Sequence, residues 1–354
     1  MKAFLHIGTT NTGNQEKQGF LAKNFNKLLN QGFLYPKSLR VANRHWALVD
    51  MVLELIKDEN LNLTQPEQVL KALKNPRLLQ AIESFNKEKE LHKDKTFIFS
   101  VEGCVWEFSS KKHIEILYAI LKALGFDEIK LMVYFRDTLD YLNSHCSQDL
   151  KNNLGYYSGD FKPQDHPRKY IFDYKWICEN YTEVFGENSL IVRLLREDYV
   201  GGTLLKDFTY HLGIKWDENF DLEQKRNESF NLLGMEIQKR LNEKDLNGQN
   251  FNSLLSISRK HFEGTKEARL KFKVQKELAK AYVDYFASSN EWVRAKYFPH
   301  KKSLFTPINW DDYKENATLK DIKEEDWDKI VDFFAEVIVS KNIIIQNLKN
   351  CNKN

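Results

Sequence analysis

The chain has 354 residues, of which 42% are hydrophobic and 13% aromatic, enough for one large α/β domain or two smaller ones. Lysine and arginine (53) nearly balance aspartate and glutamate (50), so the net charge of +3 does not indicate a nucleic-acid partner. No apolar run is as long as a membrane span, and the four cysteines lack metal-ligand spacing. We therefore expect a cytoplasmic protein with free thiols and no integral membrane segment.

The first predicted element is a strand over residues 2–7, which runs into a turn bracketed by Gly8 and Gly13. An amphipathic helix follows, whose apolar side chains are Phe20, Leu21, Phe25, Leu28 and Leu29. Such a turn exposes backbone N–H groups, and the helix dipole adds to their positive potential. The pattern is typical of a phosphate-binding loop, although a tight turn that binds no ligand is the alternative.

The loop lacks the residues that bind magnesium and ATP. In a nucleotide-triphosphate loop, Lys and then Ser or Thr follow the second glycine, whereas Asn14 and Gln15 stand here. A nucleotide kinase or NTPase is therefore disfavoured. The pattern favours an anion site made of backbone amides, which are those of Thr12, Gly13, Asn14 and Gln15.

Strands and helices alternate further along the chain. Apolar runs that read as buried parallel strands lie at residues 96–101, 129–135 and 189–194. Helices are predicted over residues 64–85, 109–124, 139–150 and 174–185. This alternation predicts an α/β fold with a mostly parallel sheet and helices on both faces. Residues 152–168 form a long loop, which is either a mobile active-site segment or a surface excursion.

The strand pattern fades after about residue 216. The helices predicted beyond it cover residues 233–241, 267–287 and 325–339. We therefore expect an α/β nucleotide-binding core at residues 1–215 and a helical C-terminal part at residues 216–354 that packs on the core.

Seven runs occur in the order typical of one family. They are HIGTTNTGNQEKQGFL (6–21), GFLYPKS (32–38), VYFRDTLDYLNSHCSQ (133–148), FGENSLIVRLLRED (185–198), KDFTYHLGI (206–214), NESFNLL (227–233) and WVRAKYFPHKKSLF (292–305). Together they resemble the bacterial sulfotransferase-like proteins of the P-loop sulfotransferase superfamily, from residue 2 to about residue 305. The resemblance implies transfer of a sulfuryl group from adenosine 3′-phosphate 5′-phosphosulfate to a hydroxyl of a carbohydrate or glycan precursor, with no metal.

The resemblance also assigns the residues that bind the donor. The 5′-phosphosulfate loop comprises Gly8, Thr9, Thr10, Thr12, Gly13, Asn14 and Gln15. Arg136 follows a strand and Ser144 lies two turns into the next helix, and this pair is implied to hold the 3′-phosphate. The alternative for Arg136 is a salt bridge with Asp137 or Asp140.

The loop departs from the family pattern at several positions. The family carries Lys where Asn11 stands, and Thr-Thr-Ser where this chain has Asn14, Gln15 and Glu16. Asn11 can donate a hydrogen bond to the bridging oxygen but carries no charge. Lys17 either supplies that charge from another direction or is solvated. A catalytically impaired nucleotide-binding protein, or a repurposed member of the same fold, is therefore the second hypothesis.

Two residues are candidates for the base that takes the acceptor proton. His45 begins a predicted helix where the family often carries its histidine, and a neutral imidazole suits the task. Glu102 follows the strand over residues 96–101 and is the rival, with Ser100 beside it either contacting the ligand or supporting the site. A surface or helix-capping histidine is the alternative for His45.

Overall fold

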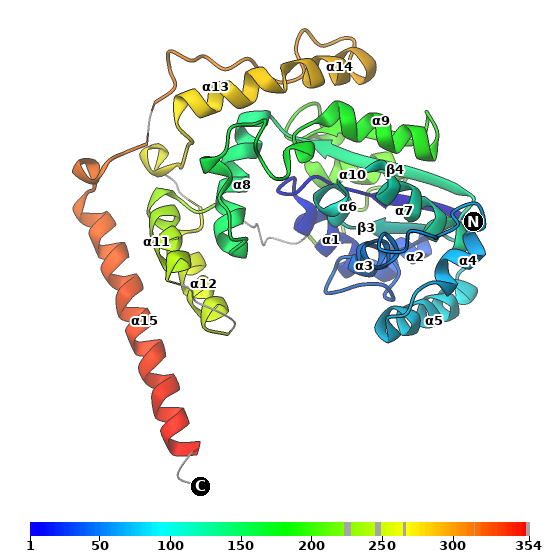
Figure 1. Cartoon of the computed structure of the whole chain (residues 1–354), viewed down its shortest axis with the longest axis horizontal. Coiled ribbons are helices and arrows are strands. Elements are labelled where there is room, and N and C mark those ends of the chain that lie inside the picture. The colour runs from blue at the N-terminus through cyan, green and yellow to red at the C-terminus, as the bar shows by residue number, and fades with distance from the viewer. Residues whose placement is uncertain (223–227, 245–248, 265–266, 315, 352–354) are drawn as a thin grey trace. The chain divides into compact units, whose positions relative to one another are not determined.

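The computed structural model describes residues 1–222, 228–244, 249–264, 267–314 and 316–351 (Figure 1). Asn227, the first residue of one run quoted above, lies outside this set. The chain forms two compact units whose segments interleave: unit 1 spans residues 1–137, 167–226 and 286–306, and unit 2 spans 138–166, 227–285 and 307–354. The sequence-based boundary at residue 215 assigns residues 138–166 to the core, whereas the structure groups them with unit 2.

Unit 1 contains a five-stranded sheet in which every neighbouring pair of strands is parallel. Its strands are β1 (Lys2–His6), β2 (Phe33–Leu34), β3 (Thr96–Ser100), β4 (Glu128–Phe135) and β5 (Leu190–Leu194), in the order β2-β3-β1-β4-β5. The predicted α/β class, with a parallel sheet flanked by helices, is confirmed. Strand β2 was not predicted, because two residues are too few to show the hydrophobic pattern of a strand.

The helices of unit 1 are α1 (Asn14–Lys23), α2 (Phe25–Asn30), α3 (Trp46–Leu55), α4 (Pro66–Lys71), α5 (Pro76–Leu91), α6 (Gly103–Glu107), α7 (Lys111–Ala123), α9 (Tyr174–Phe185), α10 (Leu204–Leu212) and α14 (Ala287–Tyr297), with short 3₁₀ turns η2 (Lys169–Ile171) and η3 (Val200–Gly202). The single helix predicted over residues 64–85 is wrong. Pro76 cannot continue a helix, and Asn75 begins α5 by accepting a hydrogen bond from the Arg77 amide at 3.0 Å.

The strand order determines which helices cover each face of the sheet. The step from β1 to β2 runs in one direction across the sheet, and the steps from β2 to β3 and from β3 to β4 run in the other. Because parallel crossovers are right-handed, α1 and α2 cover one face, and α3, α5 and α7 cover the other. Helix α10 packs against α1 and therefore shares its face.

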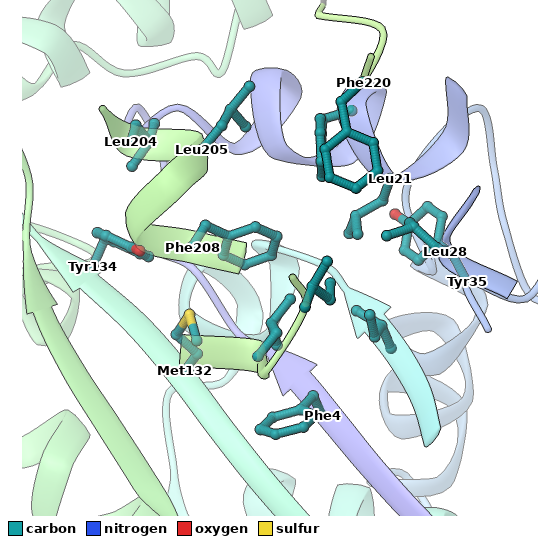
Figure 2. Packing of buried hydrophobic residues seen from close by; sticks show 14 residues of the cluster. Phe4, Leu21, Leu28, Tyr35, Met132, Tyr134, Leu204, Leu205, Phe208 and Phe220 are labelled. Carbon is teal, nitrogen blue, oxygen red and sulfur yellow. The ribbon is translucent and has the colours of Figure 1, made fainter. Parts of the chain in front are cut away.

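Apolar side chains fill the layer between the sheet and the α1 face (Figure 2). Phe4 of β1 and Met132 of β4 belong to one buried cluster with Leu21 of α1 and Phe208 of α10. Strand side chains alternate between faces, so the neighbouring residues of each strand belong to the opposite layer. The α1 layer is therefore apolar over the middle of the strands, and its polar residues lie at the carboxyl ends of the strands.

Unit 2 is helical in the residues described here. Its helices are α8 (Thr138–Asn152), α11 (Leu232–Glu243), α12 (Gln249–Phe262), α13 (Lys276–Tyr285) and α15 (Glu324–Cys351), with 3₁₀ turns η1 (Ser158–Asp160), η4 (Ala268–Leu270) and η5 (Leu319–Asp321). The helix predicted from residue 267 begins only at Lys276. Asn316 binds both the N–H and the C=O of Lys273, at 2.9 and 2.5 Å, and so competes with the helical hydrogen bonds.

Across the described parts of both units, no helix is long and apolar enough to cross a bilayer.

Candidate functional site

Three predicted site segments meet the carboxyl edge of the sheet. The chain leaves the central strand β1 toward the α1 face and leaves β3 toward the opposite face, so this edge contains a topological switch point. Open α/β sheets bind their ligands at such a point. The loop of residues 8–13 follows β1, Glu102 follows β3, and Arg136 follows β4.

The backbone of this loop explains its glycines and its asparagine. Gly8, Asn11 and Gly13 have φ values of 45°, 59° and 76°, in the left-handed region. Glycine adopts this region readily, and asparagine tolerates it better than most residues. A Cβ at Gly13 would also lie 2.4 Å from Cδ2 of Leu204. Asn11 therefore has a local conformational role.

The loop's own side chains hold it in shape. The carbonyl oxygen of Thr9 accepts hydrogen bonds from Thr12 Oγ1 and Asn14 Nδ2, both at 2.7 Å. The Thr9 hydroxyl in turn donates to the carbonyl of Tyr134 in β4 at 2.7 Å. Thr9, Thr12 and Asn14 are all buried. Their side chains therefore fix the loop, and ligand contacts would come from its backbone.

Two cationic side chains bind the next carbonyls of the loop. Arg136 Nη1 donates to the carbonyl of Asn11 at 3.2 Å, and Lys17 Nζ donates to the carbonyl of Thr12 at 2.8 Å. In a trans peptide the C=O and the following N–H point in opposite directions. The amides of Thr12 and Gly13 therefore point away from these two cations.

The N-terminus of α1 continues this row of amides. The first hydrogen bond inside the helix runs from Lys17 N to the carbonyl of Gly13 at 3.1 Å, and no side chain caps the helix at Gly13. The amides of Asn14, Gln15 and Glu16 precede that bond and have no acceptor within the helix. Glu16 places a carboxylate in the first turn, where it interacts favourably with the helix dipole and competes with a bound anion.

A buried polar layer lies at the carboxyl edge on the α1 face. The strands end on that face with His6, Ser100, Tyr134 and Arg193, and the helices add Lys17 and Gln18 from α1 and Asp207 from α10. All of these side chains except Arg193 are at most 1% exposed. The sequence analysis missed five members of this layer, which are His6, Gln18, Tyr134, Arg193 and Asp207. His6 could have been found from the sequence, because it is the last residue of β1 and alternation places it on the same face as Phe4.

One half of this layer connects β1 to Glu102. His6 Nδ1 shares a hydrogen bond of 2.8 Å with Ser100 Oγ, to which Gln18 donates at 3.2 Å. Gln18 also donates to Glu102 Oε2 at 2.8 Å, and Arg44 Nη1 donates to Glu102 Oε1 at 3.2 Å. Burial lowers the pKa of His6 well below its usual value, so its ring is neutral. Within the described chain, His6 Nε2 is buried and has no hydrogen-bond partner.

The other half is centred on Asp207. Its carboxylate accepts hydrogen bonds from the Tyr134 hydroxyl at 2.7 Å, from Arg193 Nη2 at 2.7 Å and from the Val200 amide at 2.9 Å. Burial alone would raise the pKa of Asp207, but the nearby His211 ring, 3.7 Å away, and hydrogen bonds from Arg193, Tyr134 and Val200 outweigh it and lower the pKa below its ordinary range. Asp207 is therefore ionised and fully partnered.

Lys17 lies between the two halves and is completely buried. Its Nζ is 4.2 Å from the centroid of the Tyr134 ring and 2.8 Å from the Thr12 carbonyl. The described residues place no carboxylate within ion-pair distance of it. Burial lowers the pKa of Lys17 from 10.5 to about 7. Of the two expectations for Lys17, the solvated side chain is therefore wrong.

His45 is the N-cap of α3 and is fully buried. Its Nδ1 accepts from the Ser100 amide at 3.2 Å, and its Nε2 donates to the carbonyl of Pro36 at 3.1 Å. Burial lowers the pKa of His45 to about 3, so the imidazole is neutral. Both ring nitrogens connect backbone segments, which leaves neither available for a substrate proton in this structure.

The remaining predicted site residues lie in the loop, in the first turn of α1 and in α8. Thr10 lies in the loop, and Gln15 is exposed in the first turn of α1. Asn11 Nδ2 is buried and, within the described residues, has no hydrogen-bond partner. Ser144 is buried in α8 of unit 2, and its role at the 3′-phosphate stays a prediction.

Neither a protein-family model nor a curated protein matches the chain. The solved structures that match include the crystal structure of a sulfotransferase from Alicyclobacillus acidocaldarius, with 12% identity and a TM-score of 0.36. That match covers 72% of this chain and 96% of the other. A TM-score this low supports no statement about the activity of the present protein.

Proposed function

We propose that the loop of residues 8–13 binds the phosphosulfate end of adenosine 3′-phosphate 5′-phosphosulfate, and that the protein transfers its sulfuryl group to a hydroxyl. The observation that carries the proposal is the arrangement of the loop carbonyls. Arg136 and Lys17 bind them from one side, so the amides of Thr12 and Gly13 point to the other. With the uncapped N-terminus of α1, these amides make a site for an anion.

The residues of the loop also fit such a ligand chemically. Asn11 Nδ2 is a buried donor without an acceptor among the described residues, and buried polar groups of this kind usually have a partner. A phosphoryl or sulfuryl oxygen would satisfy it. Arg136 also suits such a ligand. Its guanidinium lies next to the loop, where a positive charge favours a doubly phosphorylated nucleotide over a neutral molecule.

The proposed reaction is an in-line displacement at sulfur. The acceptor oxygen forms a bond to sulfur while the bond from sulfur to the bridging oxygen breaks, and that electron pair leaves with adenosine 3′,5′-bisphosphate. The proton of the acceptor hydroxyl passes to the Glu102 carboxylate, which Gln18 and Arg44 hold in position. Asn11 donates to the bridging oxygen as its charge develops. His45 is not assigned a step, because both its nitrogens are bonded to backbone.

The sequence resemblance alone motivates a carbohydrate or glycan precursor as the acceptor. The loop sequence motivates a second candidate, a nucleotide-binding protein that transfers nothing. Asn11 is neutral and has the left-handed φ of 59°, and loss of a charged donor at this place costs on the order of 10²–10³ in rate.

Calorimetry with adenosine 3′,5′-bisphosphate tests the nucleotide site. We expect the wild type to bind and Arg136→Ala to bind about 10–100 times more weakly, because the loop loses a neighbouring positive charge and the donor that holds the Asn11 carbonyl. Arg77→Ala, which removes an exposed arginine of α5, is the matched control and should bind as the wild type does. Equal affinity in all three proteins would refute the site.

A transfer assay separates the two candidate functions. Donor labelled with radioactive sulfur is incubated with a pool of oligosaccharides, and label in the pool is measured for the wild type and Glu102→Gln. Transfer that Glu102→Gln abolishes supports the enzyme. Nucleotide binding without transfer supports the binding protein, unless Asn11→Lys gains activity, which would identify an impaired enzyme.

A further inference from the structure

Among the charged side chains of the polar layer, Lys17 is the one whose charge has the fewest compensating partners. An ammonium has three N–H donors, yet the described residues give it one acceptor, the Thr12 carbonyl, besides the faces of the Tyr134 and Phe208 rings. Burying a charge without an opposite charge beside it is costly. Lys17 therefore lacks the partner that a buried lysine usually has.

Two of the three carboxylates around Lys17 are already engaged in ion pairs with arginines. The titratable groups that face it are Glu16 from its own helix, Glu102 after β3, Asp207 from α10, and His6 and Tyr134 from the sheet. Asp207 forms an ion pair with Arg193 at 2.7 Å, and Glu102 forms one with Arg44 at 3.2 Å. His6 is neutral. Glu16, at the edge of the loop, acts on Lys17 only from beyond ion-pair distance.

Lys17 is connected to the proposed anion site through one peptide group. Its ammonium binds the C=O of Thr12, and the N–H of the same peptide belongs to Gly13 and points the opposite way. A cation on the C=O polarises the peptide and strengthens its N–H as a donor. An anion bound by the Gly13 amide would therefore complete the pairing that Lys17 lacks.

We propose that Lys17 supplies the positive charge that the loop sequence lacks, and that it gains a proton when an anion binds the loop. This inference rests on the proposed function of the loop as an anion site. Burial lowers the pKa of Lys17 to about 7, so the free protein holds it largely neutral in mildly alkaline solution. A bound anion favours the ammonium and raises this pKa. Binding therefore takes up a proton above neutral pH, and affinity decreases as the pH rises.

Proton uptake is measured by calorimetry with adenosine 3′,5′-bisphosphate in two buffers of different ionisation enthalpy. At about pH 8.5 the phosphate groups are already fully ionised, because they titrate near pH 6. We expect the wild type to take up a measurable fraction of a proton for each nucleotide bound. Lys17→Arg should bind without proton uptake, since arginine is always charged. Lys17→Met should bind at least about tenfold more weakly and take up none, because the loop loses its charge.

Lys71→Met is the control, because Lys71 is an exposed residue of α4, and it should behave as the wild type does. Wild-type binding without proton uptake overturns the inference and leaves the proposed function intact. The same holds if Lys17→Arg or Lys17→Met takes up the wild-type number of protons. Absence of binding by the wild type refutes the proposed function itself and the inference with it. If Lys17→Met fails to fold, proton uptake by the wild type and by Lys17→Arg still tests the inference.

Discussion

Replacing Lys17 with methionine should change how the stability of the protein depends on pH. The pKa of this lysine falls from 10.5 to about 7 on folding. At about 1.4 kcal/mol for each pH unit, this displacement corresponds to about 5 kcal/mol that disfavours the charged form in the folded protein. Between these two pH values the unfolded chain binds more protons than the folded one, so wild-type stability increases as the pH rises.

Lys17→Met removes this titration but leaves the Thr12 carbonyl without its donor, at a cost of about 1–3 kcal/mol. Below about pH 7 the variant should therefore be more stable than the wild type by about 2–4 kcal/mol. That advantage should shrink by about 1.4 kcal/mol for each pH unit above 7, because the wild-type lysine loses its proton in the folded state.

Urea unfolding of both proteins at about pH 6, 7.5 and 9, followed by circular dichroism, measures this difference. All other titrating groups are common to the two proteins, so the difference isolates Lys17. The exposed Lys71→Met control should show no pH-dependent difference from the wild type. A Lys17→Met difference that is constant across the three pH values would refute the reasoning, since it would mean that Lys17 keeps its ordinary pKa.

Two further predictions concern the loop. Glu16→Gln removes the carboxylate from the first turn of α1 and should tighten bisphosphate binding by about 2–5-fold at low salt, with the gain lost at high salt; weaker binding in calorimetry would contradict it. Gly13→Ala should destabilise the protein by more than Gly213→Ala, measured by urea unfolding. Both glycines have left-handed backbone angles, at a cost of about 1–2 kcal/mol for alanine, but a Cβ at Gly13 lies 2.4 Å from Leu204, whereas one at Gly213 makes only an ordinary contact of 3.9 Å with Phe33. Equal losses would show that the contact with Leu204 relaxes freely.

The parallel sheet and the loop were predictable from local patterns. Apolar runs at the strands and the spacing of Gly8 and Gly13 depend on neighbours in the sequence, which a single chain displays. The break before Pro76 was also visible in principle, since proline rarely lies inside a helix. Arg136 was placed at the sheet edge by the strand that precedes it, and the structure brings it to the Asn11 carbonyl.

The environment of single polar side chains was not predictable in the same way. Lys17 is buried because α10, almost two hundred residues later, returns to pack on α1 and covers it with Phe208. His45 is held by Pro36 and Ser100, which come from separate segments of the chain. Such contacts depend on tertiary packing, and a position in a motif says nothing about them.

The side-chain donors on the loop carbonyls have a consequence for how quickly a ligand can be captured. The conformational entropy of the loop is lost when the protein folds, because Thr12, Asn14, Arg136 and Lys17 already hold its shape. A ligand would meet a rigid receptor and would not have to wait for a closing motion. Capture would then be governed by diffusion and by the local electric field, and residence time by the contacts made on arrival.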